Sequence, residues 1–142
     1  MLRALLVDDE QNNLDNLDFM LRNDCEGVQV SGLAHNAEEA RNWLKQQSAD
    51  ILFLDINMPG ETGFDLLKSL PEHSMKVIFV TAYSDYSLQA IKASAVDYIL
   101  KPVKIEDLQI AIEKVKRMIG SSFAMEESKQ LLQQLLQTAS FK

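Results

Sequence analysis

The sequence predicts an α/β domain built on a doubly wound sheet of five parallel strands. Short apolar runs alternate along the chain with segments whose apolar residues recur at helical spacing. Several of the runs are apolar throughout, which indicates strands that are covered on both faces. Parallel strands that are joined by right-handed helical crossovers give a sheet between two layers of helices.

The first half of the chain supplies three of the predicted strands. Leu2–Val7 is the first, Val28–Leu33 the second, and Ile51–Leu54 the third, which ends at Asp55. Asn36 is a suitable N-cap for the helix between the second and third strands. The apolar positions of the two intervening helices are Leu14, Leu17 and Leu21, then Ala37, Ala40 and Leu44.

The second half repeats the pattern twice. A turn-rich stretch, 57–63, leads into a short helix over Phe64–Leu70, and the fourth strand, Val77–Val80, ends at Thr81. The fifth strand, Tyr98–Leu100, ends at Lys101-Pro102. The fourth helix is marked by Leu88 and Ile91, and the fifth by Ile105, Leu108, Ile112, Val115 and Ile119.

Composition limits the classes of function. The chain has 142 residues, the size of one ordinary domain, and no apolar run approaches the roughly 20 residues of a membrane span. One cysteine, Cys25, favours a reducing compartment, so we expect a cytoplasmic protein without a membrane partner. A net charge of −7 argues against DNA binding by this chain, because DNA binding needs clustered Lys and Arg.

Chemically reactive side chains follow four of the predicted strands. The first strand ends in Asp8-Asp9, the third in Asp55, the fourth in Thr81 and the fifth in Lys101. The carboxyl ends of parallel strands share one edge of the sheet, where ligands of such folds bind. We therefore expect three carboxylates, a hydroxyl and an ammonium to converge on one crevice.

The expected cluster has the chemistry of a phosphoryl acceptor. Neighbouring carboxylates repel one another, and Mg²⁺ relieves this because it binds carboxylates together with waters and phosphate oxygens. Lys101 adds a positive charge suited to a phosphate oxygen, and Thr81 adds a hydroxyl donor. A carboxylate beside a metal ion and a lysine can act as a nucleophile toward phosphorus.

Four motifs resemble those of the response regulator receiver domains of bacterial two-component systems, across roughly residues 2–119. They are Val7-Asp8-Asp9-Glu10, Phe53-Leu54-Asp55-Ile56-Asn57-Met58-Pro59 with Gly63, Val80-Thr81-Ala82, and Asp97-Tyr98-Ile99-Leu100-Lys101-Pro102. The resemblance implies a flavodoxin-like, CheY-like fold with strand order 2-1-3-4-5. Residues 79–91 and 95–98 also resemble receivers that are joined to LytTR-type DNA-binding domains.

The resemblance implies a role for each matching residue. Asp55 would be phosphorylated by a sensor histidine kinase, assisted by Thr81 and Lys101. Mg²⁺ would be held by Asp8, Asp9, Asp55 and the backbone carbonyl of Asn57. Phosphorylation would then change the surface of the fourth helix, fifth strand and fifth helix and favour a homodimer. The remaining implied roles are Thr81 and Tyr98 as the switch pair, Pro102 in a cis peptide bond with Lys101, and Asn57 and Tyr83 as residues that set the lifetime of the phosphoryl group.

Two other classes share this architecture. A flavin binder needs a Ser-, Thr- or Gly-rich loop after the first strand, and here that loop is acidic. A phosphatase with an aspartyl intermediate usually has a second carboxylate two residues after the nucleophile, and here that residue is Asn57. Bound flavin would support the first alternative, and steady hydrolysis of small phosphate esters the second.

The last part of the chain has a different character. Gly120-Ser121-Ser122 predicts a break or hinge after a receiver domain of residues 1–119. Residues 120–142 are expected to form a linker or a C-terminal helix leading to an effector domain that this chain lacks, through which DNA would be bound. A dimerisation helix is the alternative, since a short heptad stripe is formed by Met125, Ser128, Leu132, Leu135 and Ala139.

Overall fold

The computed structural model describes the backbone of residues 1–86 and 95–139, and the side chains of these residues other than 86, 121–129 and 137–139. The predicted fourth helix, marked by Leu88 and Ile91, therefore lies outside the described residues. The strands are β1 Leu2–Val7, β2 Val28–Ala34, β3 Ile51–Leu54, β4 Lys76–Thr81 and β5 Asp97–Leu100. The helices are α1 Gln11–Asp24, α2 Ala37–Gln46, α3 Gly63–Ser69, the 3-10 turn η1 Ser84–Tyr86, and α5 Ile105–Ala139.

The strands form a single parallel sheet in the order β2-β1-β3-β4-β5, as predicted. The order reverses between β1 and β3, which lie next to each other at the centre of the sheet. Every residue of β3 is buried, as is every residue of β4 except its first. The carboxyl ends of β1 and β3 are therefore held side by side by strands that are covered on both faces.

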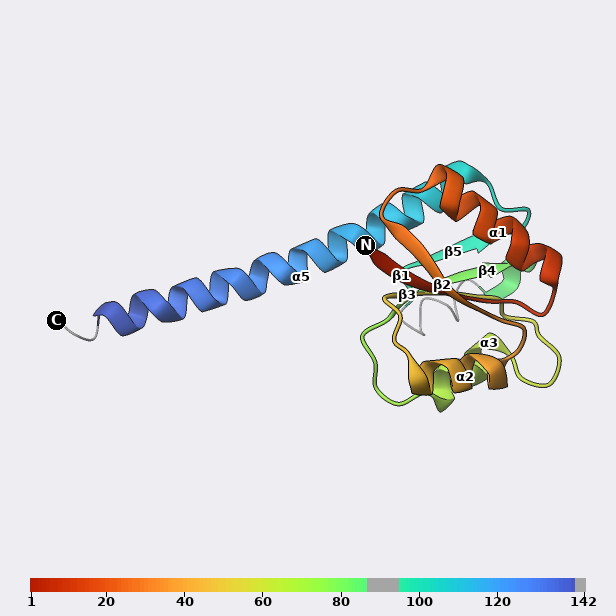
Figure 1. Cartoon of the computed structure of the whole chain (residues 1–142), viewed down its shortest axis with the longest axis horizontal. Helices are drawn as coiled ribbons and strands as arrows, with labels where there is room; N and C mark the ends of the chain where they lie inside the picture. Colours follow the sequence, from red (N-terminus) through yellow and green to blue (C-terminus); the bar gives the residue numbers. More distant parts are fainter. Residues whose placement is uncertain (87–94, 140–142) are drawn as a thin grey trace.

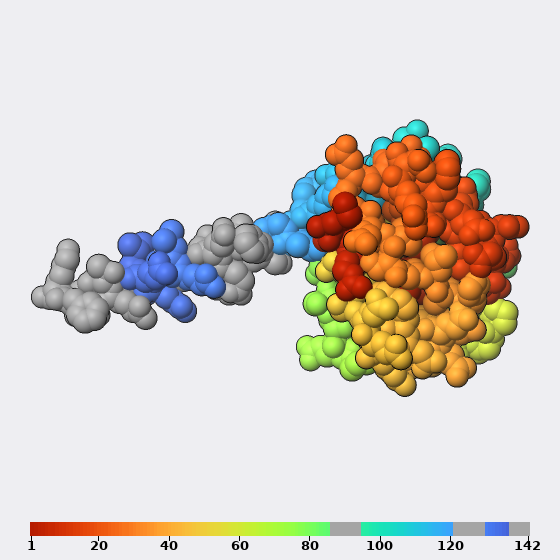
Figure 2. All heavy atoms as spheres, viewed as in Figure 1, coloured from red at the N-terminus to blue at the C-terminus, as the bar shows by residue number. Residues whose placement is uncertain are grey.

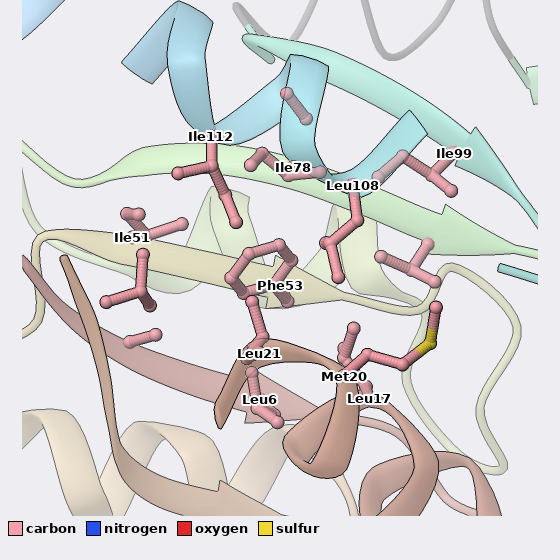
Figure 3. Close-up of a cluster of buried hydrophobic side chains, with 14 of the residues drawn as sticks. Leu6, Leu17, Met20, Leu21, Ile51, Phe53, Ile78, Ile99, Leu108 and Ile112 are labelled. Carbon is pink, nitrogen blue, oxygen red and sulfur yellow. The ribbon is translucent and has the colours of Figure 1, made fainter. Parts of the chain in front are cut away.

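Two hydrophobic cores lie on the two faces of the sheet. Alternate residues of β1 divide between them, because successive side chains of a strand point to opposite faces. α1 and α5 cover the first core, where Phe53 packs among Leu21, Leu108 and Ile112 (Figure 3). α2 and α3 cover the second core, to which Trp43 adds partly buried surface.

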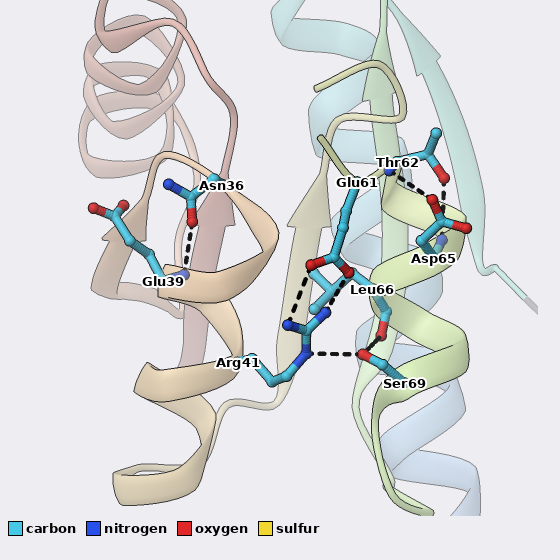
Figure 4. Close-up of polar contacts among 8 residues, drawn as sticks. All are labelled: Asn36, Glu39, Arg41, Glu61, Thr62, Asp65, Leu66 and Ser69. Carbon is cyan, nitrogen blue, oxygen red and sulfur yellow. Dashed lines mark hydrogen bonds and ion pairs between the residues drawn. The ribbon is translucent and has the colours of Figure 1, made fainter. Parts of the chain in front are cut away.

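Side-chain caps position the helices of the second face (Figure 4). Asn36 Oδ1 accepts a hydrogen bond from the Glu39 amide at 2.8 Å, as expected for the N-cap of α2. Thr62 and Asp65 form a reciprocal capping box at the start of α3. Arg41 of α2 donates to both oxygens of Glu61, at 3.3 and 2.5 Å, and so joins α2 to the loop before α3.

The prediction of a break at residues 120–122 is wrong, because α5 continues without interruption from Ile105 to Ala139. One glycine in a helix costs only about 1 kcal/mol relative to alanine, and Ser121 and Ser122 cost less. The surrounding helix formers outweigh these costs. α5 packs on the sheet near its N-terminus and then projects away from the body of the domain (Figure 1).

No helix among the described residues is long and apolar enough to cross a membrane. Cys25 is partly buried against the first core, and burial raises the pKa of its thiol. A partly buried thiol with a raised pKa indicates a packed rather than a reactive cysteine.

Candidate functional site

The structure brings together the side chains that follow β1, β3, β4 and β5. Asp8 and Asp55 are each 6% exposed, Thr81 is fully buried, and Lys101 is partly buried. The backbone fixes these positions, since the Asp55 amide donates to the Val7 carbonyl at 3.0 Å. The Lys101 amide donates to the Thr81 carbonyl at 2.7 Å.

The ammonium of Lys101 holds two carboxylates at once. Its Nζ lies 2.7 Å from Asp8 Oδ2 and 3.1 Å from Asp55 Oδ2. The three side chains are at most 18% exposed, so these are charge-assisted hydrogen bonds shielded from bulk water. Lys101 thereby connects the end of β5 to the residues that follow β1 and β3.

Asp8, Asp9 and Asp55 form a cluster of hard oxygen donors. One oxygen from each carboxylate lies within 4.8 Å of the other two, with Asp8 and Asp55 buried and Asp9 exposed. A cation could therefore be reached from solvent on the Asp9 side. This donor set suits Mg²⁺, which binds a few carboxylates and keeps several waters.

The hydroxyl of Thr81 has unused hydrogen-bonding capacity. Its Oγ1 is buried and has no hydrogen-bond partner of normal geometry among the described residues. It lies near enough to Asp55 to lower the pKa of that carboxyl by a small amount. A buried hydroxyl without a partner costs free energy and calls for an explanation, which an acceptor brought into the site would supply.

Burial and charge change the protonation of the site. Burial raises the pKa of Asp55 above its usual range, and the carboxylate of Asp8 raises it further, while the charge of Lys101 opposes both. Burial by itself would lower the pKa of Lys101, but the hydrogen bond to Asp8 and the charges of Asp55 and Asp8 raise it. Lys101 therefore stays protonated beside a carboxylate whose ionisation is unfavourable without more positive charge nearby.

The structure adds three supporting contacts that pattern reading did not identify. The Glu10 amide and the Asn13 side chain donate to Asp8 Oδ1 at 2.9 and 3.4 Å. Asn13 also lines, with Asp8 and Lys101, a cavity of about 60 Å³ between α1 and the strand ends. A Cβ on Gly63 would lie 2.5 Å from the Asp55 carbonyl oxygen, so α3 approaches the backbone of Asp55 closely. Only the three-dimensional packing reveals these contacts.

The other predicted site residues lie around this centre. Asn57 is half-buried in the loop after Asp55, and the Lys101–Pro102 peptide bond is cis. The hydroxyl of Tyr98 donates to the backbone carbonyl of Tyr83, two residues beyond Thr81. The ring of Tyr98 also packs against Phe79, with centroids 6.4 Å apart.

A sequence model of the response regulator receiver domain matches residues 4–113. The sensory transduction protein LytT of Bacillus subtilis is 38% identical over 120 residues, which are 83% of this chain and 49% of LytT. LytR of Staphylococcus haemolyticus is 36% identical over 126 residues, 85% of this chain and 48% of LytR. The chain therefore spans about half the length of these relatives.

Solved receiver structures have the same fold. The response regulator TrrA of Thermotoga maritima, crystallised with Mg²⁺ and BeF, has a TM-score of 0.71 and 32% identity, covering 81% of this chain and 99% of TrrA. A CheY-like receiver domain of Methanospirillum hungatei has a TM-score of 0.72 and 32% identity, covering 85% and 98%. The similarity to LytT and LytR agrees with the expected LytTR-type subfamily. This chain belongs to the response regulator receiver domain family.

Proposed function

We propose that Asp55 accepts a phosphoryl group from the phosphohistidine of a sensor histidine kinase, with Mg²⁺ bound at Asp8, Asp9, Asp55 and the backbone carbonyl of Asn57. The single observation that carries this proposal is the contact of Lys101 with Asp8 and Asp55 at 2.7 and 3.1 Å, inside a cluster of three carboxylates. Receivers as a family act as phosphoacceptors rather than conventional enzymes.

The described residues supply most of what the transfer requires. The P–N bond of the phosphohistidine breaks as a bond forms between phosphorus and an Asp55 carboxylate oxygen, and the imidazole takes a proton from solvent. Lys101 is already beside Asp55 and stabilises negative charge on the phosphoryl oxygens. A bound Mg²⁺ would neutralise further charge on those oxygens. Water then hydrolyses the aspartyl phosphate, and Asn57 and Tyr83 tune the rate of this step.

A chain of contacts connects Asp55 to the surface. A phosphoryl oxygen gives the buried Thr81 hydroxyl the acceptor that it lacks. In the structure, the backbone carbonyl of Tyr83, two residues after Thr81, accepts a hydrogen bond from the Tyr98 hydroxyl on β5. Movement of Thr81 displaces this carbonyl. Release of Tyr98 changes the surface of β5, α5 and the predicted fourth helix. This is a shift between two populated states that favours a homodimer.

The output of this switch lies outside the residues described. Transcriptional regulators are among the relatives, such as BtsR of Salmonella typhi at 33% identity over 118 residues. We propose that DNA is bound by an effector segment coupled to this receiver and not by the acidic receiver itself.

Intact mass after incubation with acetyl phosphate and Mg²⁺ tests the proposal. We compare wild type with Asp55→Asn and with Asp50→Asn, a matched control that removes an exposed carboxylate just before the opposite end of β3. The expected result is a gain of one phosphoryl group in wild type and Asp50→Asn, abolished by Asp55→Asn and by a chelator. No gain in wild type would contradict the phosphoacceptor proposal and leave switching by protein contact alone.

A further inference from the structure

Four leucines of α5 form an exposed apolar surface far from the phosphoryl-acceptor site. Leu131, Leu132, Leu135 and Leu136, here termed the leucine face, are 57–63% exposed. They lie on the part of α5 that projects away from the body of the domain (Figure 2). Residues 130–139 contain no charged side chain, and glutamines flank the leucines.

The leucine face is centred near Leu135 on the side of α5 away from the body of the domain, and Leu136 borders the body side because it follows the buried Ala111 by 25 positions, or about seven turns. Leu108, fully buried against the sheet, precedes Leu135 by 27 positions, which is about seven and a half turns of a helix with 3.6 residues per turn. The two side chains therefore leave the helix in opposite directions. Ile110, which is 52% exposed, precedes Leu135 by 25 positions, or about seven turns, and lies in line with the leucine face. The centre of this face therefore cannot continue the packing of α5 on its own sheet.

A second copy of the same helix fits this surface. In a parallel, in-register pair with Leu132 and Leu135 at positions a and d of a heptad, Leu131 occupies position g and Leu136 position e. Position g of one helix lies beside position e of the other, so each Leu131 meets the Leu136 of the second copy. All four leucines are then covered, and the uncharged flanks introduce no like-charge repulsion.

The geometry of the body permits this pairing. Because the body lies on the far side of α5 from the leucine face, two bodies in a parallel pair lie on the outer sides of the helix pair and do not collide. The pairing also gives a reason for the helix to persist beyond the body, since most helical stability in proteins comes from the packing of an amphipathic face rather than from intrinsic propensity.

We propose that the leucine face of α5 pairs in parallel with the leucine face of a second copy of this chain, independently of phosphorylation at Asp55. This contact lies on the projecting part of α5 and is separate from the phosphorylation-dependent surface proposed above, which is formed by β5, the predicted fourth helix and the part of α5 that packs on the sheet. The paired stripe is short, so the expected dissociation constant of the full chain is on the order of 0.1 mM.

Sedimentation equilibrium of the full chain tests the proposal with two matched double variants. Leu132→Glu with Leu135→Glu places two charges on the leucine face. Gln130→Glu with Gln133→Glu places the same two charges on the body side of the same turns, since Gln133 follows Leu108 by about seven turns. All four side chains are exposed, so the receiver body is expected to fold in every variant.

We expect wild type, the glutamine variant and Asp55→Asn to dimerise alike, and the leucine variant to bind at least tenfold more weakly. Wild type that stays monomeric up to about 1 mM overturns the proposal. Equal weakening in both double variants, or in neither, also overturns it, because the contact would then not be the leucine face. Association lost in Asp55→Asn overturns the claim of independence without affecting the mass test of phosphorylation.

Oxidative cross-linking tests the parallel register. With Cys25→Ser as background, Leu132→Cys is expected to form a disulfide dimer, because a parallel pair brings the two copies of position 132 within disulfide range. Gln133→Cys is the control on the body side of the helix. Cross-linking of Gln133→Cys equal to that of Leu132→Cys overturns the parallel arrangement.

Discussion

Replacement of Gly63 by alanine tests whether α3 must approach the phosphoacceptor as closely as the structure places it. The added Cβ would lie 2.5 Å from the Asp55 carbonyl oxygen and 3.1 Å from Leu54 Cγ. Non-bonded carbon atoms attract best at about 3.5–4.0 Å, so the methyl group would lie roughly 1 Å too close to the Asp55 carbonyl oxygen. The first obstacle is backbone, which cannot rotate away as a side chain can.

The expected cost follows from this overlap. Overpacking of a well-filled site by one methyl group costs about 1–3 kcal/mol, and we expect Gly63→Ala to lower the free energy of unfolding by about that amount in urea titrations. Relief of the clash must move α3 or the backbone of Asp55 by roughly 1 Å. A misplacement of that size can slow a reaction by up to about 100-fold, so phosphorylation by acetyl phosphate should slow by at least tenfold.

Gly120→Ala provides the control for the added methyl group. A Cβ on Gly120 meets nothing within 4 Å, and alanine favours a helix, so this variant should match or slightly exceed wild-type stability. An unfolding free energy of Gly63→Ala within about 0.5 kcal/mol of wild type, with normal phosphorylation, would refute the argument that close approach at Gly63 positions Asp55.

Three further predictions concern charge and hydrogen bonding in the site. Lys101→Met leaves the carboxylates of Asp8 and Asp55 buried without their cation, so the free energy of unfolding in the presence of a chelator should fall by about 3 kcal/mol. Added Mg²⁺ should restore part of this lost stability in a thermal shift assay. Burial raises the pKa of Asp55 in the folded chain, so ionisation of Asp55 lowers the free energy of unfolding as the pH rises above the pKa of an unfolded aspartate. Without metal, Asp55→Asn should therefore have a higher free energy of unfolding than wild type at pH 7. The difference should vanish below about pH 4, where the carboxyl group is protonated in both the folded and the unfolded chain. Thr81→Val removes a hydroxyl without a hydrogen-bond partner of normal geometry, so the free energy of unfolding of the unphosphorylated variant should stay within about 1 kcal/mol of wild type. The variant should lose phosphorylation-dependent association. A larger loss of stability would show that the hydroxyl is already paired.

Most of the fold could be predicted because each signal was local. The buried strands are continuous apolar runs in the sequence. Asn36 caps α2 through a hydrogen bond with a residue only three positions away. The convergence of the strand ends followed from topology, since parallel strands place their carboxyl ends on one edge. The contacts of Asp8 with Asn13 and of Tyr98 with Tyr83 could not be predicted, because side-chain direction and loop path decide them.

The wrong prediction at residues 120–122 has a different origin. Gly and Ser interrupt patterns in sequence, but their cost in a helix is about 1 kcal/mol or less for each residue. The periodic stripe that packs on the sheet ends near Ile119, and that end of packing was mistaken for an end of helix. The exposed leucines beyond it show that the helical pattern resumes about half a turn away from the earlier stripe.

The charges of the site connect metal binding to switching. With all three carboxyl groups ionised, Asp8, Asp9 and Asp55 carry three negative charges and Lys101 one positive charge, so the cluster holds an excess of negative charge, and two of its carboxylates are buried. A divalent cation brings the sum to zero, which makes ionised Asp55 available as a nucleophile. A phosphoryl group, with its charge of about −2, then replaces the single charge of Asp55 and restores a local excess. Lys101 keeps its contact with Asp8 while it meets a phosphoryl oxygen, and the hydroxyl of Thr81 is a second nearby donor with capacity left to meet that excess. On this argument, Thr81 responds to the phosphoryl group and not to the metal ion.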